Sequence, residues 1–305
     1  MIGSVAPRSA IGVTGRDRAS YLQGLLTNDI SSLTAGTGCY AAWLTPQGRM
    51  LTDLHVFESG DMILLDVPAD LASATLSRLD QFLFSEDVQL ADLSATLTSV
   101  WIHGPSASTI LERVISGASG LTGAKDYANV RVAFGESPAV IARVDQLGVP
   151  GFCVYVQPDS VNELRRALES AGAVVADPAI IELARIEARY PVFGIDMTED
   201  TIPLEAGIET RAISFTKGCY VGQEVIIRVL HRGHGRVARR LVQLRVEGKA
   251  PARGAKVIAS EREIGWITSA ADAPEGEAIA LAYVHRDSAV PATRAEIEGQ
   301  SATVQ

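Results

Sequence analysis

The sequence contains one short pattern twice, and this repeat constrains the fold more than any other feature. A strand-like run that ends in glycine precedes a helix start at residues 13–22 and again at residues 102–111, 89 positions further on. Asp17 and Ser106 stand at the two helix starts and are residue types that cap exposed N–H groups. The pattern therefore predicts two copies of one strand–helix unit.

Both copies continue with two apolar runs around a turn, followed by an amphipathic helix. The turn lies at residues 58–61 in the first copy and at residues 146–150 in the second. In both helices the apolar residues recur at spacings of three and four, which places them on one face. We predict two similar α+β units up to about residue 170, each an antiparallel sheet with helices against it, and a pocket where the units meet. The alternative is a chance likeness between common patterns.

The last third of the chain changes character. Residues 179–189 predict one more helix, which ends before Tyr190 because a residue that precedes proline disfavours the helical conformation. Beyond it, short strands alternate with turn signals and predict a small β-barrel. We expect three structural parts, at residues 1–95, residues 96–235 with the central helix, and residues 236–305 with the barrel.

Composition and charge restrict the class of function. The formal net charge of the 305 residues is −9, which argues against broad nucleic-acid binding because that relies on Lys and Arg at phosphates. Cys39, Cys153 and Cys219 are too few and too scattered for a disulfide framework or a C-x-x-C metal site. Residues 1–8 lack a secretory pattern, and no apolar stretch approaches the roughly 20 residues that span a bilayer. We expect a reduced, cytoplasmic protein that binds neither nucleic acid nor membrane.

The segment around Cys219 has the character of a loop before a helix. Gly218 and Gly222 flank Cys219 and permit close approach of the backbone or a positive φ. Helical spacing of apolar residues begins at Gly222, so Cys219 is expected at or just before a helix N-terminus, beside Lys217. The helix end and the ammonium group both favour a thiolate, which is a nucleophile or a metal ligand. The alternative is a cysteine that packs as a small hydrophobic residue.

Residues 217–224, K-G-C-Y-V-G-Q-E, are similar to the K-G-C-Y-x-G-Q-E signature of the YgfZ branch of the YgfZ/GcvT-type folate-binding proteins. The resemblance covers nearly the whole chain. The other matching segments are residues 21–30 (Y-L-Q-G-L-L-T-N-D-I), 45–54 (T-P-Q-G-R-M-L-T-D-L), 185–188 (R-I-E-A), 194–196 (G-I-D), 203–206 (P-L-E-A) and 265–270 (G-W-I-T-S-A).

This resemblance implies a fold and a function. The implied fold is α+β, a three-part ring in which two similar antiparallel-sheet and helix units surround a central folate pocket and a small C-terminal β-barrel completes the ring. The implied cofactor is tetrahydrofolate or a folate derivative. The implied role is support of the assembly or repair of iron–sulfur clusters, with client or assembly proteins as partners. The signature makes Cys219 the candidate reactive thiol.

The resemblance also implies residues that bind the cofactor. Glu187 stands where the aminomethyltransferase branch has a pterin-binding glutamate, and a carboxylate can accept two neighbouring pterin N–H groups. Lys217 and Arg228 are candidates for the folate carboxylates. Asn28 and Asp29 follow a predicted helix and are expected to reach the pocket. The alternative for Glu187 and Arg228 is a structural ion pair.

Two departures separate this chain from the aminomethyltransferase branch. Thr52 stands at the first of two positions at which that branch carries acids, and threonine cannot hold a negative charge against a developing iminium. Aminomethyl transfer is therefore doubtful, unless Asp53 substitutes through a one-residue shift of the alignment. Arg189 and Tyr190 replace a Gly-Met pair, so the rim of the pocket must differ.

A metal set of Cys219, His231 and His234 is conceivable, because thiolate and imidazole bind zinc and iron. Its spacing matches no metal signature, so we favour surface histidines near a helix end and predict no metal site.

Three functions compete. The first is folate-dependent maintenance of iron–sulfur clusters, and the alternative is a tetrahydrofolate-dependent aminomethyl or one-carbon transferase. The third is a redox thiol or cluster ligand at Cys219 beside a vestigial folate pocket.

Overall fold

A computed structural model describes residues 1–231 and 236–305 of the chain. The first unit consists of β1 (Arg8–Thr14), α1 (Arg18–Leu25), β2 (Thr37–Leu44), β3 (Met50–Glu58), β4 (Ile63–Pro68), η1 (Ala69–Leu71), α2 (Ala72–Asp80) and β5 (Gln89–Asp92). Its strands form an antiparallel sheet in the order β2-β3-β4-β1-β5. One face of this sheet packs against α1 and α2, because Leu22 and Leu79 of the helices share a buried core with Leu54 of β3.

The second unit has the same construction. It consists of β6 (Thr98–His103), α3 (Ala107–Val114), η2 (Ala118–Leu121), β7 (Asn129–Phe134), β8 (Ser137–Arg143), β9 (Gly151–Val156), η3 (Pro158–Ser160) and α4 (Val161–Ser170). Helices α3 and α4 bury Leu111, Leu164 and Leu168 against one face of this sheet. The apolar spacing in the sequence correctly predicted that face.

The repeat in the sequence corresponds to a repeat in topology. The second sheet has the order β6-β9-β8-β7, which reproduces β1-β4-β3-β2 of the first sheet strand for strand. Asp17 and Ser106 occupy the N-cap positions of α1 and α3, but neither side chain forms a capping hydrogen bond, so that part of the prediction is wrong. Asp17 Oδ2 instead accepts a hydrogen bond from the backbone N–H of Asp87 at 2.9 Å, because a neighbouring loop competes for it.

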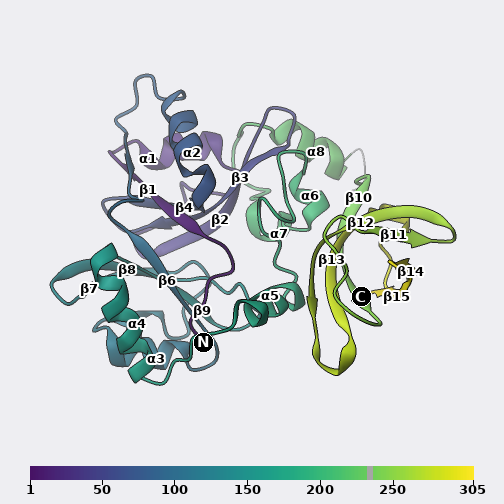
Figure 1. Ribbon diagram of the computed structural model, residues 1–305. Helices are drawn as coiled ribbons and strands as arrows, with labels where there is room; N and C mark the ends of the chain where they lie inside the picture. The colour runs from purple at the N-terminus through teal and green to yellow at the C-terminus, as the bar shows by residue number, and fades with distance from the viewer. Residues whose placement is uncertain (232–235) are drawn as a thin grey trace.

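The two sheets face each other across a shared core. The faces not covered by helices contribute Phe57 of β3 and Tyr155 of β9, whose ring centroids lie 6.2 Å apart. Buried residues from the segment that follows the second unit, among them Met197 and Tyr220, complete this core. Figure 1 shows the first unit, in purple and blue, above the second, in teal.

The segment between the second unit and the barrel contains α5 (Pro178–Glu187), α6 (Pro203–Ala206), α7 (Glu209–Ala212) and α8 (Gln223–His231). Figure 1 shows α5 running from the second unit toward the barrel and α6 to α8 beside β2 and β3. Fully buried Arg185 of α5 fixes this arrangement, since its Nη1 donates to Asp196 Oδ2 at 2.8 Å and its Nη2 to Ser269 Oγ at 2.6 Å. Breaking a buried pair of this kind costs about 3–5 kcal/mol.

The C-terminal part is a closed barrel with the strand order β10-β13-β12-β11-β14-β15. Its elements are β10 (Arg239–Val246), β11 (Lys256–Ala259), β12 (Arg262–Asp272), η4 (Pro274–Gly276), β13 (Ala278–His285), η5 (Arg286–Ser288), β14 (Arg294–Ile297) and β15 (Gln300–Val304). Small inward residues such as Ala280 and Ala282 fill the barrel with Val257 and Ile267. Closure leaves the sheet without an unpaired edge.

The α+β fold with two similar antiparallel units and a C-terminal β-barrel is therefore confirmed. The domain boundaries at residues 95 and 235 stay predictions. No helix in the described ranges is long and apolar enough to cross a membrane.

Candidate functional site

A row of polar side chains crosses the first sheet on the face that points into the shared core. The register pairs Tyr40 of β2 with His55 of β3, and His55 with Asp66 of β4. Directly opposed residues on antiparallel strands lie close enough to touch. His55 Nδ1 lies 2.7 Å from Asp66 Oδ2, and the rings of Tyr40 and His55 lie 5.7 Å apart. All three side chains are fully buried, which costs free energy unless their polar atoms are paired.

Arg8 of β1 supplies the positive charge beside this row. Its Nε donates to Asp66 Oδ2 at 2.6 Å, and its Nη1 donates to Asp53 Oδ1 at 3.2 Å. The hydroxyl of Tyr40 donates to the other oxygen of Asp53 at 2.9 Å. Burial alone would raise the pKa of Asp66, but Arg8 and His55 outweigh it and hold the pKa of this carboxyl below its usual value. Asp66 is thus a fixed negative charge in the interior.

His55 connects the sheet to residues from other elements. Its Nε2 lies 3.0 Å from the hydroxyl of Tyr190, and Gln146 Nε2 donates to the same hydroxyl at 3.5 Å. Burial lowers the pKa of His55, and the charge of Arg8 lowers it further, so the ring is neutral. Because a carboxylate only accepts, His55 Nδ1 carries the hydrogen and donates to Asp66. His55 Nε2 therefore accepts from Tyr190, and the chain of hydrogen bonds has one direction.

Arg211 of α7 lies over two tyrosine rings at the edge of this group. Its guanidinium carbon is 5.1 Å from the ring centroid of Tyr40 and 4.4 Å from that of Tyr190. A guanidinium over an aromatic face is attracted by the ring quadrupole. The residue is half-buried. We call this group of residues the central cluster. It consists of Arg8, Tyr40, Asp53, His55, Asp66, Gln146, Tyr190 and Arg211.

The structure decides which of two neighbouring residues on β3 faces the central cluster. Side chains alternate between the faces of a strand. Leu54 and Val56 belong to the core under α1 and α2, so Thr52 points to that helix-covered side and its hydroxyl donates to the backbone oxygen of Asp53. Asp53 points to the opposite side, into the central cluster. Thr52 therefore does not face the central cluster. Its lack of a negative charge does not speak against transfer chemistry there.

Asn28, one of the residues expected to bind the cofactor, lies next to the central cluster, and Asp29 follows it in the chain. Asn28 Nδ2 donates to the backbone oxygen of Tyr40 at 2.8 Å and to that of Arg211 at 3.0 Å. The Asn28 amide thereby holds β2 to α7. Asp29 is half-buried, and its Oδ1 accepts from Gln23 Nε2 at 2.9 Å. Contact of either side chain with a cofactor stays a prediction.

Lys217 satisfies the carboxyl end of α1 and the loop that follows it. Its Nζ donates to the backbone oxygens of Gln23, Leu26 and Asn28 at 2.6, 2.7 and 2.8 Å. These three bonds use all three hydrogens of an ammonium group. Burial lowers the pKa of Lys217 to about 8. A folate carboxylate would have to displace one of these carbonyls, so the cofactor role of Lys217 stays a prediction that this geometry does not favour.

Cys219 is exposed and lies in the loop four residues before α8 begins at Gln223. The expected position just before a helix is confirmed. Cys39 is half-buried, and burial raises the pKa of its thiol to about 12. Cys153 is fully buried, and burial likewise raises the pKa of its thiol. Cys219 therefore remains the thiol with access to solvent.

Most of the signature around Cys219 has a structural explanation. Gly222 has φ +85°, and a Cβ there would lie 2.5 Å from the backbone oxygen of Thr45. Gly48 has φ +75°, and a Cβ there would lie 2.9 Å from the Cβ of Val225. The T-P-Q-G turn and the K-G-C-Y-V-G-Q-E segment, separated by about 170 positions, thus pack directly on each other. Cys219 is not part of this contact.

The remaining candidates lie apart from one another. Glu187 is exposed at the end of α5, three residues before Tyr190, and Arg228 is exposed on α8. No ion pair joins them among the described residues, so the alternative of a structural pair is not observed. His231 is exposed at the end of α8, while His234 lies outside the described residues. Within the described ranges no group of three potential metal ligands gathers.

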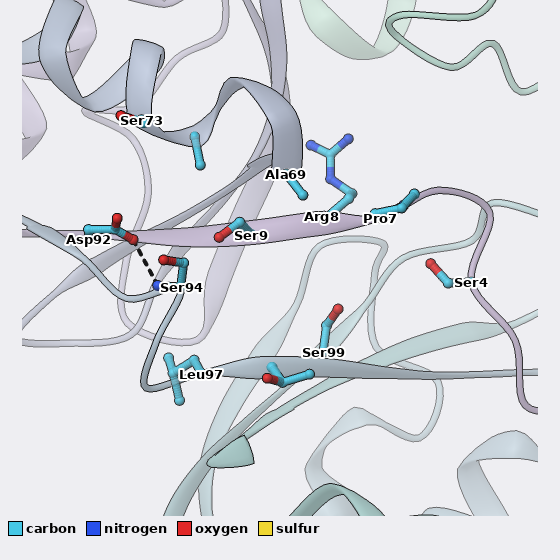
Figure 2. Close-up of a pocket in the computed structure, with 12 residues that line it drawn as sticks. Ser4, Pro7, Arg8, Ser9, Ala69, Ser73, Asp92, Ser94, Leu97 and Ser99 are labelled. Atoms are coloured by element: carbon cyan, nitrogen blue, oxygen red, sulfur yellow. Dashed lines mark hydrogen bonds between the residues drawn. The ribbon is translucent and has the colours of Figure 1, made fainter.

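A cavity of about 510 Å³ lies where β1 and α2 of the first unit face β6 of the second. Figure 2 shows that small serines line much of it and that the side chain of Arg8 points away from Ser99 and Leu97. The Arg8 guanidinium is already bound to Asp53 and Asp66. The cavity therefore offers few charged groups for chemistry, and the central cluster is the better candidate site.

Sequence reasoning missed most of the central cluster, although a signal was present. In strand β3 the segment T-D-L-H-V places Asp53 and His55 on one face, and charged residues inside an apolar strand are unusual. Arg8 and Asp66 are likewise single charges in apolar strands. Arg211 comes from the short helix α7 and Tyr190 from the segment after α5, and only their contacts reveal them.

Two helix-backed antiparallel sheets that face each other, with a closed β-barrel beside them, make up the glycine cleavage T-protein class of fold. The family described as GCVT N-terminal domain matches residues 4–217, and the glycine cleavage T-protein C-terminal barrel domain matches residues 239–305. The chain belongs to this glycine cleavage T-protein family. The YgfZ branch within this family stays a prediction.

Relatives and a solved structure agree with this family. An aminomethyltransferase of Rubrobacter xylanophilus is 30% identical over 282 residues, which are 92% of this chain and 74% of that protein. One from Nostoc is 31% identical over 88% of this chain and 73% of its own length. The crystal structure of aminomethyltransferase T from Bartonella henselae superposes with a TM-score of 0.84 at 23% identity, covering 99% of this chain and 83% of that one.

Proposed function

We propose that the chain binds a reduced folate at the central cluster and transfers a one-carbon unit to it. An aminomethyl donor would pass on a methylene unit and release ammonia, and an N-methyl donor would pass on its intact methyl group and release the amine. The observation that carries this proposal is that Asp53 faces the central cluster, whereas Thr52 does not. An acid is thereby available where positive charge develops, which is the usual main contribution to such catalysis. The relatives named aminomethyltransferase support the same function. A cytoplasmic location belongs to this proposal.

The residues at the central cluster fit a folate in kind. Asp66 Oδ1 and Gln146 Oε1 are buried acceptors without a donor among the described residues. A reduced pterin offers several N–H donors, and unpaired buried acceptors are costly. The exposed carboxylate of Glu187 lies three residues from Tyr190 and could accept from the same ring. When bound, tetrahydrofolate would supply the nitrogen that accepts the one-carbon unit.

Asp53 would act as a fixed charge. One of its oxygens accepts from Arg8 and the other from Tyr40, so its position is held by groups already in place. Each carboxylate oxygen has a further lone pair, which a donor amine of the ligand would use. His55 and Asp66 would orient the hydroxyl of Tyr190. Stabilisation of charge and orientation of the ligand are thus the roles that these residues support.

The test compares Asp53→Asn with Thr52→Val. We would measure methylene-tetrahydrofolate formation from aminomethyl donors and methyl-tetrahydrofolate formation from N-methyl donors, and tetrahydrofolate binding separately. Removal of a preorganised electrostatic group costs about 10²–10³-fold in turnover. We expect that loss in Asp53→Asn with folate binding retained, and little change in Thr52→Val. Turnover that survives Asp53→Asn, or a wild type that forms no product with any donor, would contradict the proposal.

A second function is favoured by one specific observation, the exposed thiol of Cys219 inside the K-G-C-Y-V-G-Q-E segment. Lys217, Tyr220 and Gly222 of that segment have structural tasks, whereas the exposed thiol of Cys219 takes no part in these contacts. Support of iron–sulfur cluster assembly or repair, with client proteins as partners, would use such a thiol. We expect Cys219→Ser to lower cluster-enzyme activities in cells while the fold stays intact. Normal activities in a strain with only the serine variant would exclude this role.

A further inference from the structure

Arg211 differs from the other charged residues of the central cluster. Its guanidinium forms no hydrogen bond and no ion pair within the described part of the chain, and its contacts are the two tyrosine faces. Aromatic faces attract the positive charge but accept few hydrogen bonds from the five N–H donors. A half-buried guanidinium in this state has donors to offer to a ligand.

The carboxylates nearby do not take these donors. Asp53 and Asp66 bind Arg8, Tyr40 and His55, and neither lies within ion-pair distance of Arg211. Glu209, two residues earlier on the same short helix, forms no ion pair with Arg211 either, as expected because such residues do not face each other. The charges of Arg8, Arg211, Asp53 and Asp66 sum to zero. A ligand with one positive and one negative group would leave that balance unchanged.

Arg211 is also held in place before any ligand arrives. Asn28 Nδ2 binds its backbone oxygen at 3.0 Å. The Tyr40 ring beneath it is fixed by Asp53, and the Tyr190 ring is fixed by His55. A side chain that is already ordered loses little entropy on binding. A guanidinium whose contacts are aromatic rings keeps its N–H donors, and two of them match the two oxygens of a carboxylate.

We propose that Arg211 is the anion-receiving residue of the central cluster and binds a carboxylate of the ligand. This inference rests on the proposed folate-dependent function and adds the class of substrate. The carboxylate comes from a zwitterionic N-methyl amino acid, with its amine toward Asp53, or from the glutamate tail of the folate. The charge balance favours the zwitterion.

Two ligand pairs that differ only in the carboxylate test the proposal by calorimetric titration. The first pair is N-methylglycine and N-methylglycinamide, and the second is tetrahydrofolate and its α,γ-diamide. Each is titrated into wild type, Arg211→Met and Arg211→Lys. Arg113→Met, which removes an exposed arginine of α3, is the matched control. Near-UV circular dichroism verifies that each variant keeps its tertiary packing.

We expect wild type to prefer the acid of one pair by about 10–100-fold, the range for a hydrogen bond between charged groups. Arg211→Met should lose that preference, Arg211→Lys should keep part of it, and Arg113→Met should keep all of it. The pair that shows the effect identifies the source of the carboxylate. Equal affinities within both pairs in wild type, or a preference that survives Arg211→Met, would overturn the proposal.

The two proposals can fail separately. The diamide retains the pterin ring but carries no carboxylate, so its binding reports on the folate site alone. If wild type binds neither tetrahydrofolate nor the diamide, the proposed folate function fails, while the N-methylglycine pair still decides whether Arg211 receives a carboxylate.

Discussion

Replacement of Gly222 by alanine should destabilise the protein strongly, although it adds only one methyl group. The backbone at Gly222 has φ +85°, a conformation that costs a residue with a Cβ about 1–2 kcal/mol. The new Cβ would also lie 2.5 Å from the Thr45 oxygen and 2.9 Å from the Leu44 Cβ, and overpacking of this kind typically costs about 1–3 kcal/mol. The sum is about 2–5 kcal/mol, because the Thr45 oxygen belongs to the backbone and cannot rotate away.

Gly218 provides the matched control within the same signature. A Cβ there meets no atom within 4 Å, and its φ is not positive. We expect Gly218→Ala to change the free energy of unfolding by no more than about 0.5 kcal/mol, the usual range for an open surface position. Urea unfolding followed by fluorescence measures both variants against wild type. Equal effects of the two substitutions would show that the signature does not pack on the Thr45 turn as described.

Three further predictions concern single side chains. Below about pH 6.5 the free energy of unfolding of wild type should fall with decreasing pH by up to ~1.4 kcal/mol per pH unit more than that of His55→Gln. The reason is that burial lowers the pKa of His55, so only the unfolded chain takes up that proton. Parallel urea titrations at pH 5–8 measure this, and equal pH slopes of the two proteins would contradict it. Lys217→Met should lower the free energy of unfolding by about 2–4 kcal/mol, because it leaves three carbonyls without their donor. Lys249→Met, at an exposed position, is the control in the same urea titration. Cys219→Ser should leave the unfolding midpoint unchanged, since the thiol is exposed, and a clear drop would indicate a packed thiol.

The fold was largely predictable because its signals are local and repeated. Apolar spacing at Leu164 and Leu168 identified a helix face, and turn residues marked the barrel strands. Both depend on backbone geometry within a few residues. The side-chain cap at Asp17 is missing because a loop from elsewhere in the chain competes for its carboxylate, and the missing cap at Ser106 has no such explanation. Local sequence contains no record of such a competitor.

The candidate site was much less predictable, and the reason is physical. Its hydrogen bonds join residues far apart in sequence, such as His55 with Tyr190, and no spacing rule relates them. The resemblance drew attention to Thr52, but strand alternation assigns the central face to Asp53. Lys217 was singled out for its charge, which the structure uses to satisfy the end of α1. A motif can identify a family while most of its residues serve packing.

The contact between the signature and the first unit has a consequence for the order in which the chain can fold as it is made. Thr27 Oγ1 donates to the backbone oxygen of Ala212, and Lys217 donates to that of Asn28. The residues at the end of α1 therefore lack these partners until about 185 further residues have been synthesised. At ribosomal speeds of about 5–20 residues per second, that synthesis takes roughly 10–40 s. During it, the carbonyls at the end of α1 have only water as a partner. The nascent first unit is thus complete only after the second unit has left the ribosome, and chaperones have their opportunity in that interval.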